Sequence, residues 1–248
     1  MPSRALYAWT PNTGPQPSST VLGHSLRRLH SFHGHMFPVE RMYRLWAAIT
    51  AAKAQEGAVP LTHLGTSMAR SGFQPFARFL EASGTHLQSL HLDMRVVAFW
   101  REDNAVDAFH SSGLSLSGCR QLRKLTVGLH APSRRWSCSH VSVFAALLCT
   151  TARCAPLAHI TVIFDILTTE AFEIPGFPEG LAALDGRMAE MPQLRRVDWL
   201  LAQSGGGRQQ SPDDVNSVEY RSGMLKTYFC AVARREEVEV SWRALRRD

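Results

Sequence analysis

One short hydrophobic pattern, L-x-x-L-x-L, recurs along most of this 248-residue chain. Its clearest copy is residues 122–127, in which Leu122, Leu125 and Val127 are separated by polar residues. Similar copies begin at Leu61, Leu87, Leu157 and Leu194, and two degraded copies begin at Leu26 and Arg235. The first positions of successive copies lie 26 to 41 residues apart. Such regular spacing indicates a repeat architecture.

Between the copies, hydrophobic residues recur at steps of three and four, which is the period of an amphipathic helix. These stripes predict helices over residues 39–49, 73–80, 141–148, 181–191 and 224–232. The segment 101–118 ends in a Ser/Gly-rich stretch and therefore predicts only a short or irregular helix. The repeating unit is a helix, a short turn and a strand.

Side chains alternate across a strand, so the last two hydrophobic residues of each copy point to one side. Stacked copies would form one apolar ladder of Leu90, Leu125, Ile160, Val197 and Val238, and a second of Leu92, Val127, Val162, Trp199 and Val240. Strands joined through helices are expected to be parallel, with the helices on one face. We therefore predict an α/β fold: a leucine-rich-repeat-like solenoid with a parallel strand ladder on its concave face and helices on its convex face.

The same predicted register identifies the residues that are exposed on the concave strand face. One row is His63, Ser89, Lys124, His159, Arg196 and Glu237, and its neighbour is Gly65, His91, Thr126, Thr161, Asp198 and Glu239. A mixed-charge sheet face is a common protein-recognition surface, although the alternative for any single residue is ordinary solvation. The predicted partner-binding residues are His63, His91, Lys124, Thr126, His159, Thr161, Arg196 and Asp198.

Composition supports a folded chain with short unstructured ends. Hydrophobic residues make up 45% and charged residues 19% of the sequence, enough to build a substantial core. Residues 1–20, rich in Pro and Ser, predict a disordered leader; the repeats span 21–242, and 243–248 form a basic tail. The glycine-rich segment 202–216 predicts a surface loop.

Charge and cysteine content favour a protein of the cytoplasm or nucleus. The net charge is +6, mainly from arginine, which permits contact with acidic surfaces without requiring it. The five cysteines are scattered through apolar segments and do not indicate a disulfide framework; we expect Cys149 and Cys154 to pack beneath the strands. The first residues do not form a signal peptide, and no apolar run is long enough to span a bilayer.

A family resemblance rests on the two best copies, Cys119-Arg-Gln-Leu-Arg-Lys-Leu-Thr-Val127 and Cys154-Ala-Pro-Leu-Ala-His-Ile-Thr-Val162. Over residues 22–242 the chain resembles the leucine-rich-repeat region of fungal F-box-type proteins. The resemblance implies a substrate-receptor subunit that binds proteins for ubiquitination. The chain contains no clear F-box, because the one match to its apolar-Pro-x-Glu opening, residues 37–40, is assigned to a repeat helix. The expectation is either a repeat-only paralogue or a chain that lacks an upstream F-box.

Motifs for catalysis, metals or cofactors are not found. His24, His30, His33 and His35 are close in sequence, but no cysteine or carboxylate stands at matching spacing, which favours a surface turn over a zinc site. There is no nucleophile elbow, zinc-protease helix, phosphate-binding loop or dinucleotide fingerprint. The sequence therefore predicts a non-enzymatic chain without a cofactor or resident metal.

The leading functional hypothesis is a scaffold that binds another protein through its concave strand face. The resemblance adds the substrate-recognition part of an F-box-type ubiquitin ligase receptor, with ligase components as further partners. The alternative is a basic nucleic-acid-binding solenoid that uses residues 27–28, 134–136, 195–196 and the terminal arginines. That alternative is less favoured, because these arginines fall on different parts of the repeat, and it requires binding that weakens steeply with salt. No membrane contact is predicted.

Overall fold

The computed structural model describes residues 28–34, 39–55, 58–68, 70–94, 105–130, 139–151, 156–165, 169–202 and 218–245. Several predicted features lie outside these residues: the leader at 1–20, most of the loop at 202–216, and the arginines at positions 27, 134, 135, 246 and 247. Among the residues described, no helix is both long and apolar enough to cross a membrane.

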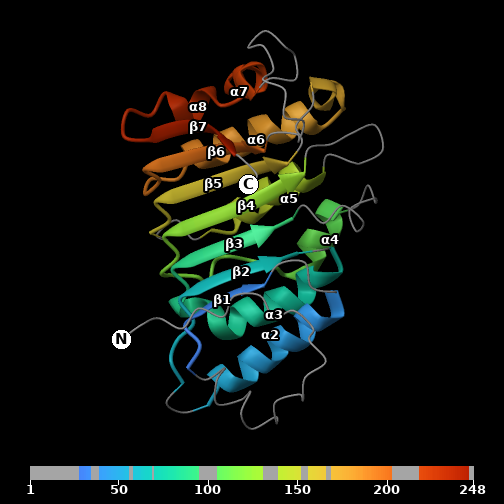
Figure 1. The fold of residues 1–248 in the computed structure, drawn as a ribbon, viewed down its shortest axis with the longest axis vertical. Coiled ribbons are helices and arrows are strands. Elements are labelled where there is room, and N and C mark those ends of the chain that lie inside the picture. The colour runs from blue at the N-terminus through green and yellow to red at the C-terminus, as the bar shows by residue number, and fades with distance from the viewer. Residues whose placement is uncertain are drawn as a thin grey trace.

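The structure is organised around an open sheet of seven parallel strands (Figure 1). The strands are β1 (Ser31–Gly34), β2 (His63–Ser67), β3 (Ser89–Asp93), β4 (Lys124–His130), β5 (His159–Asp165), β6 (Arg196–Ala202) and β7 (Glu239–Leu245). They are hydrogen-bonded in the order of the sequence, and the sheet does not close into a barrel. Each strand from β2 to β6 therefore pairs with the described strands before and after it in the chain, and β1 and β7 each pair with one of them.

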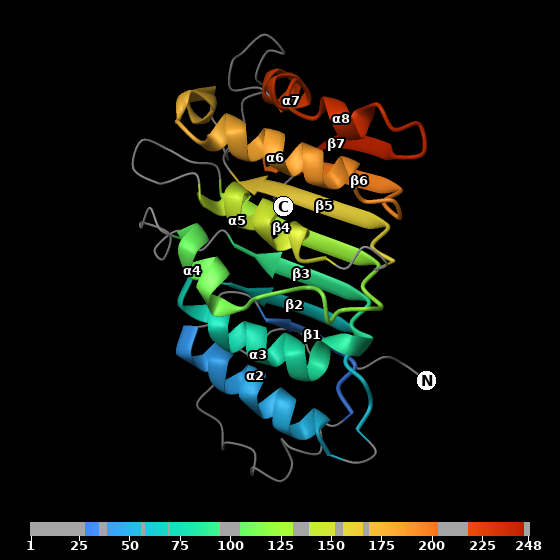
Figure 2. The same ribbon diagram turned by 180° about the vertical axis from the view of Figure 1, so that it is seen from behind.

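Helices lie along one face of this sheet (Figure 2). They are α2 (Val39–Lys53), α3 (Phe73–Ser83), α4 (Ala105–Ser112), α5 (Ser139–Cys149), α6 (Phe177–Ala189), α7 (Val218–Lys226) and α8 (Cys230–Ala233). Short 3-10 turns occupy Arg70–Gly72, Gly84–His86 and Thr169–Glu173. We call the other side of the sheet, seen in Figure 1, the uncovered face. The predicted α/β class and the parallel strand ladder are confirmed.

The final predicted helix is divided into α7 and α8. Phe229, which separates them, leaves the helical conformation with φ −109° and ψ 51°. Its ring packs against Trp199 of β6, with the ring centroids 4.0 Å apart. The helix therefore breaks at the residue whose aromatic side chain enters the core.

The core is built from inward-facing rows that run across the strands. Leu90, Leu125, Ile160 and Val197 are opposite one another, and each is fully buried. The predicted second row, Leu92, Val127, Val162 and Trp199, is equally buried. A third buried row, Leu129, Phe164 and Leu201, was not predicted, because β4, β5 and β6 continue beyond the six-residue motif.

The predicted register is wrong in the last strand. Val240, not Val238, is opposite Val197, and Trp242 is opposite Trp199. Val238 instead takes the place of the first leucine: its amide donates to the carbonyl of Arg235, as the amide of Leu194 donates to that of Met191. The connection into β7 is one residue shorter, so Glu239 replaces Glu237 in the outward row. The strand also continues to Leu245, beyond the predicted boundary at 242.

The first copy is likewise misplaced in the sequence prediction. Phe32 is opposite Leu64, so this repeat begins at Leu29 rather than at Leu26, which lies outside the described residues. Leu29 is 4% exposed and occupies the position that Leu61 has in the next repeat. The segment containing His30 and His33, expected as a surface turn, is strand β1 with one residue before it.

The inward rows generate a stability prediction. Replacing Leu125, which is fully buried in the central strand, by Ala should lower the free energy of unfolding by about 2–5 kcal/mol, because a cavity is left in the core. Replacing the adjacent, exposed Lys124 by Ala should change it by less than about 0.5 kcal/mol. Urea denaturation followed by circular dichroism measures both. Equal losses would show that the inward and outward assignments are wrong.

Candidate binding site on the uncovered sheet face

All eight predicted partner-binding residues occupy the two outward rows. The first polar row comprises Ser31, His63, Ser89, Lys124, His159, Arg196 and Glu239, and the second comprises His33, Gly65, His91, Thr126, Thr161, Asp198 and Ser241. Successive residues of a row stand on neighbouring strands, about 4.8 Å apart. Gly65 has a steric role, because a Cβ at this position would overlap the imidazole of His33.

Asp198 is the centre of a hydrogen-bonded network on this face. Both of its carboxylate oxygens accept from Nε of Arg196 at 3.0 Å, and Oδ2 lies 2.7 Å from Nε2 of His159. The hydroxyl of Ser241 donates to Oδ1. Thr161 Oγ1 lies 3.2 Å from the same His159 nitrogen. The network thus joins side chains from β5, β6 and β7.

Electrostatics keep the carboxyl of Asp198 ionised. Burial alone would raise its pKa, but hydrogen bonds from Arg196, Ser241 and His159 outweigh burial and lower the pKa from 3.8 to about 2. The carboxylate in turn raises the pKa of the Arg196 guanidinium. Asp198 is 8% exposed, so its charge is directed to these partners rather than to solvent.

The other predicted residues extend from this network towards β2. Lys124 is exposed on β4, and Thr126 is half-buried beside it. His91 on β3 is also half-buried, whereas His63 on β2 is exposed. His63 is three strands away from His159, a separation of roughly 14 Å. The structure therefore brings His159, Thr161, Arg196 and Asp198 into contact, and places the other four residues along the same face.

Two parts of this face were missed by the sequence analysis. Ser241 was missed because the last strand was assigned the wrong register. A third outward row, comprising Ser67, Asp93, Gly128, Ile163, Leu200 and Arg243, lies beyond the repeat motif. The apolar run that continues after Val162 and Trp199, as Ile163-Phe164 and Leu200-Leu201, is the signal that could have revealed it.

The network does not have the geometry of a nucleophilic triad. In a triad, one imidazole nitrogen contacts the acid and the other contacts the nucleophile. Here the same nitrogen of His159 contacts Asp198 and Thr161, and Ser241 donates to the carboxylate instead of to the imidazole. The arrangement fixes side-chain positions and offers hydrogen bonds. Within the described part of the chain, no group of three or more potential metal ligands occurs.

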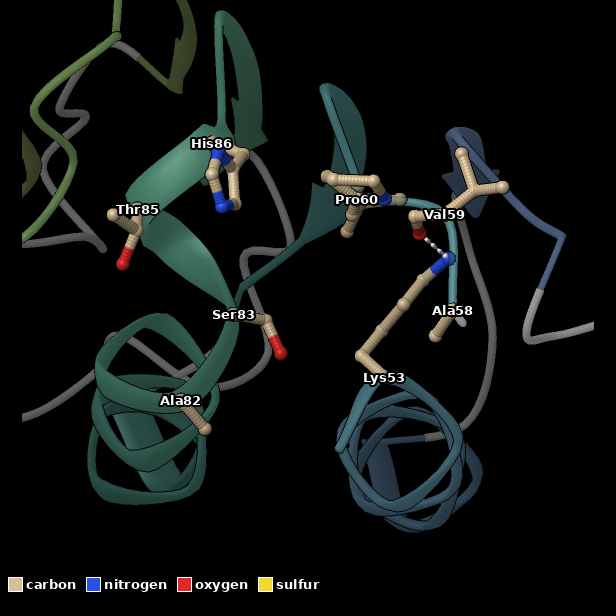
Figure 3. Close-up of a pocket in the computed structure, with 9 residues that line it drawn as sticks. Lys53, Ala58, Val59, Pro60, Ala82, Ser83, Thr85 and His86 are labelled. Atoms are coloured by element: carbon tan, nitrogen blue, oxygen red, sulfur yellow. Dashed lines mark hydrogen bonds between the residues drawn. The ribbon is translucent and has the colours of Figure 1, made fainter. Parts of the chain in front are cut away.

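A separate small pocket lies between the ends of α2 and α3 (Figure 3). Its volume is about 280 Å³, and its lining includes Lys53, Val59 and His86. Nζ of Lys53 donates to the carbonyl oxygens of Leu29 and Val59, and burial lowers the pKa of this lysine. Lys53 therefore ties α2 to the residues before β1 and β2, which is a structural role.

The cysteines within the described residues give no further site. Cys149, expected beneath the strands, is exposed at the end of α5, and Cys154 lies outside the described residues. Cys119 is buried, which raises its pKa to about 11 and disfavours the reactive thiolate.

The sequence matches no protein-family model, and no curated protein matches it significantly.

The network predicts a loss of stability when Asp198 is replaced by Asn. The amide keeps the shape but removes the charge that holds Arg196 and His159, so we expect a loss of about 1–3 kcal/mol in unfolding free energy at pH 7. Urea unfolding measures the difference. The control is Glu239→Gln, because Glu239 is exposed and its contact with Arg196 is 3.4 Å long; its effect should be below about 1 kcal/mol.

The pH dependence of this difference has a definite sign. The folded pKa of Asp198 lies below its ordinary value of 3.8, so its stabilising contribution is present above about pH 4 and is lost as the pH falls towards 2. The gap between the wild-type protein and the Asp198→Asn variant should therefore shrink over that interval. Unfolding free energies measured between pH 5 and pH 2 test this, and a gap that stays constant would contradict the assigned pKa.

Proposed function

We propose that the chain is a leucine-rich-repeat-like solenoid that binds another protein through its uncovered sheet face. The repeat is supported by hydrogen bonds at the strand starts, where two consecutive amides donate to one carbonyl of the preceding repeat. The amides of Thr62 and His63 both donate to His30, and those of Arg195 and Arg196 both donate to Ala158. The intervening junctions, at Gln88–Ser89, Arg123–Lys124 and Ala158–His159, have the same arrangement.

The observation that carries the binding proposal is the network around Asp198. It holds Arg196 and His159 in fixed positions on a face that no described helix covers (Figure 1). Their side chains remain partly accessible, at 34% and 25% exposure. Polar groups that are already ordered lose less conformational entropy when a partner binds. This arrangement suits a specific polar contact with another protein.

Protein binding is favoured over nucleic-acid binding by the charges on this face. Arg196 is already paired with Asp198 and lies 3.4 Å from Glu239. A phosphate backbone would compete with both carboxylates for that arginine. Nucleic-acid binding relies on cations that are available to neutralise phosphates, and the pairing reduces their number here.

The role as a substrate receptor of a ubiquitin ligase follows from the family resemblance and stays a prediction. It would place the protein in the cytoplasm or nucleus. It also makes the uncovered face the substrate-binding surface and assigns contact with ligase components to another part of the protein.

The experiment is site-specific photo-crosslinking. A photoreactive amino acid at position 124, exposed on the first polar row, should form adducts with a partner protein in cells. The same amino acid at position 74, exposed on α3 of the helix layer, should not form them. Mass spectrometry identifies the adducts. Adducts confined to position 74 would contradict the assigned face.

A quantitative test then uses the partner so identified. Replacing Lys124, His159 and Arg196 together by Ala should weaken its affinity by at least tenfold, because three side chains at the centre of the face are removed. The matched control replaces Arg41, Arg44 and Arg78, which are exposed on α2 and α3, and should leave the affinity unchanged. Titration calorimetry measures both. Unchanged affinity in the first variant would refute the proposed site.

A further inference from the structure

The uncovered face differs in chemistry from one end of its central strands to the other. At the strand starts, Lys124, His159 and Arg196 stand side by side on β4, β5 and β6. All three side chains donate hydrogen bonds or carry positive charge. Lys124 is exposed and forms no ion pair among the described residues. His159 and Arg196 contact the carboxylate of Asp198, so Lys124 is the cation of this row that favours an anionic contact.

The third outward row is hydrophobic where it crosses β5 and β6. Ile163 and Leu200 are opposite each other and half-buried, and they alternate with the fully enclosed Phe164 and Leu201. They stand four residues beyond His159 and Arg196 on the same strands, which is a distance of about 13 Å. Two aliphatic side chains at this place favour a hydrophobic contact beside the anionic one.

Two exposed cations on the three rows favour an acidic partner. The carboxylates of these rows are Asp93, Asp198 and Glu239, and the first two are only 7% and 8% exposed. Arg196 is paired with Asp198 and Glu239. Lys124 and Arg243 are exposed and form no ion pair among the described residues, so they are the cations that an acidic partner can pair with.

Between these two regions the face offers little steric obstruction. Thr126 and Thr161 occupy the second polar row on β4 and β5, and Gly128 lies next to Ile163 in the third row. Short side chains allow another backbone to come close to the sheet. An extended segment lying along β5 and β6 would span the 13 Å with about four residues.

We propose that this face binds an extended acidic segment of a partner protein, with a carboxylate on Lys124 and a hydrophobic side chain on Ile163 and Leu200. The two partner residues are four positions apart, in either chain direction. This inference rests on the proposed function, since it names the partner chemistry for the same face. A nucleic-acid strand fits less well, because its repeated phosphates would meet Ile163 and Leu200.

The test is a selection of 12-residue peptides from a displayed random library on the immobilised full-length protein. Peptides enriched by the wild-type protein should carry Asp or Glu four positions from Leu, Ile, Phe or Met. With Lys124→Glu the acidic preference should disappear, whereas with Leu200→Ser the hydrophobic preference should disappear and the acidic one remain. The control Arg78→Glu, on the helix layer, should select the same peptides as the wild-type protein.

Affinities of one enriched peptide complete the experiment. Lys124→Glu and Leu200→Ser should each weaken its binding at least tenfold, and Arg78→Glu should not. Ile163→Thr serves as a second hydrophobic variant if Leu200→Ser has an altered thermal unfolding curve. Replacing the acidic residue of the peptide by Lys should weaken its binding to the wild-type protein as much as Lys124→Glu weakens binding of the original peptide, if the carboxylate contacts Lys124.

The possible failures are distinguishable. Peptides that bind this face without an acidic preference, or without the hydrophobic residue, would overturn the inference and leave the proposed function standing. Peptides whose binding is unaffected by every substitution on the face would overturn both. Displacement of the peptide by single-stranded polyuridylate, with an affinity that falls steeply as salt rises, would also overturn the acidic-segment proposal.

Discussion

The whole structure depends on burial of three inward rows of hydrophobic side chains beneath a parallel sheet. A strand that slipped by one residue would turn its hydrophobic side chains to solvent and its polar ones into the core. Ile160 and Val197 are fully buried opposite each other, and at the start of each strand from β2 to β6 two amides share one carbonyl at the start of the preceding strand. Hydrophobic burial and backbone pairing therefore specify the same register.

That register is what creates the polar site. Thr161, Asp198 and Ser241 are far apart in sequence, and they meet because β5, β6 and β7 pair in order. Asp198 on the middle strand can accept from residues on both sides, which is why burial of its carboxylate is tolerated. The polar site therefore forms because packing of the buried side chains fixes the pairing of the strands. Its side chains are held by a rigid sheet instead of by loops.

The sequence was sufficient for the interior repeats because their hydrophobic positions permit one frame. Leu122, Leu125 and Val127 leave no alternative match, and the predicted neighbours of His159 and Arg196 are found where the register puts them. The terminal copies were ambiguous. Leu29 fits the pattern as its first or as its second hydrophobic position, and the pairing of Phe32 with Leu64 shows that it is the first. At the last copy Val238 was assigned to the second position although it is the first, because the connection into β7 is one residue shorter and turn length is not encoded in hydrophobic spacing.

The contacts within the site could not be predicted from the pattern. Alternation tells which face a residue occupies, but it does not tell that Arg196 turns towards Asp198 on its own strand. Nor does it tell that His159 uses one nitrogen for two partners. These choices depend on side-chain conformation and on the balance between burial and hydrogen bonding, which only the assembled sheet determines.

The last strand connects the stability of the sheet to the geometry of the site. Among the described strands β7 pairs only with β6, and Val240 and Trp242 on its inward side are half-buried. Trp242 stacks on Trp199 with centroids 5.2 Å apart, and Nζ of Lys226 lies 5.9 Å from its ring centroid. Because Ser241 and Glu239 belong to this strand, the aromatic stack that docks β7 also brings them to Asp198 and Arg196. A change at the inward face of the edge strand would therefore alter the outward face that we assign to binding.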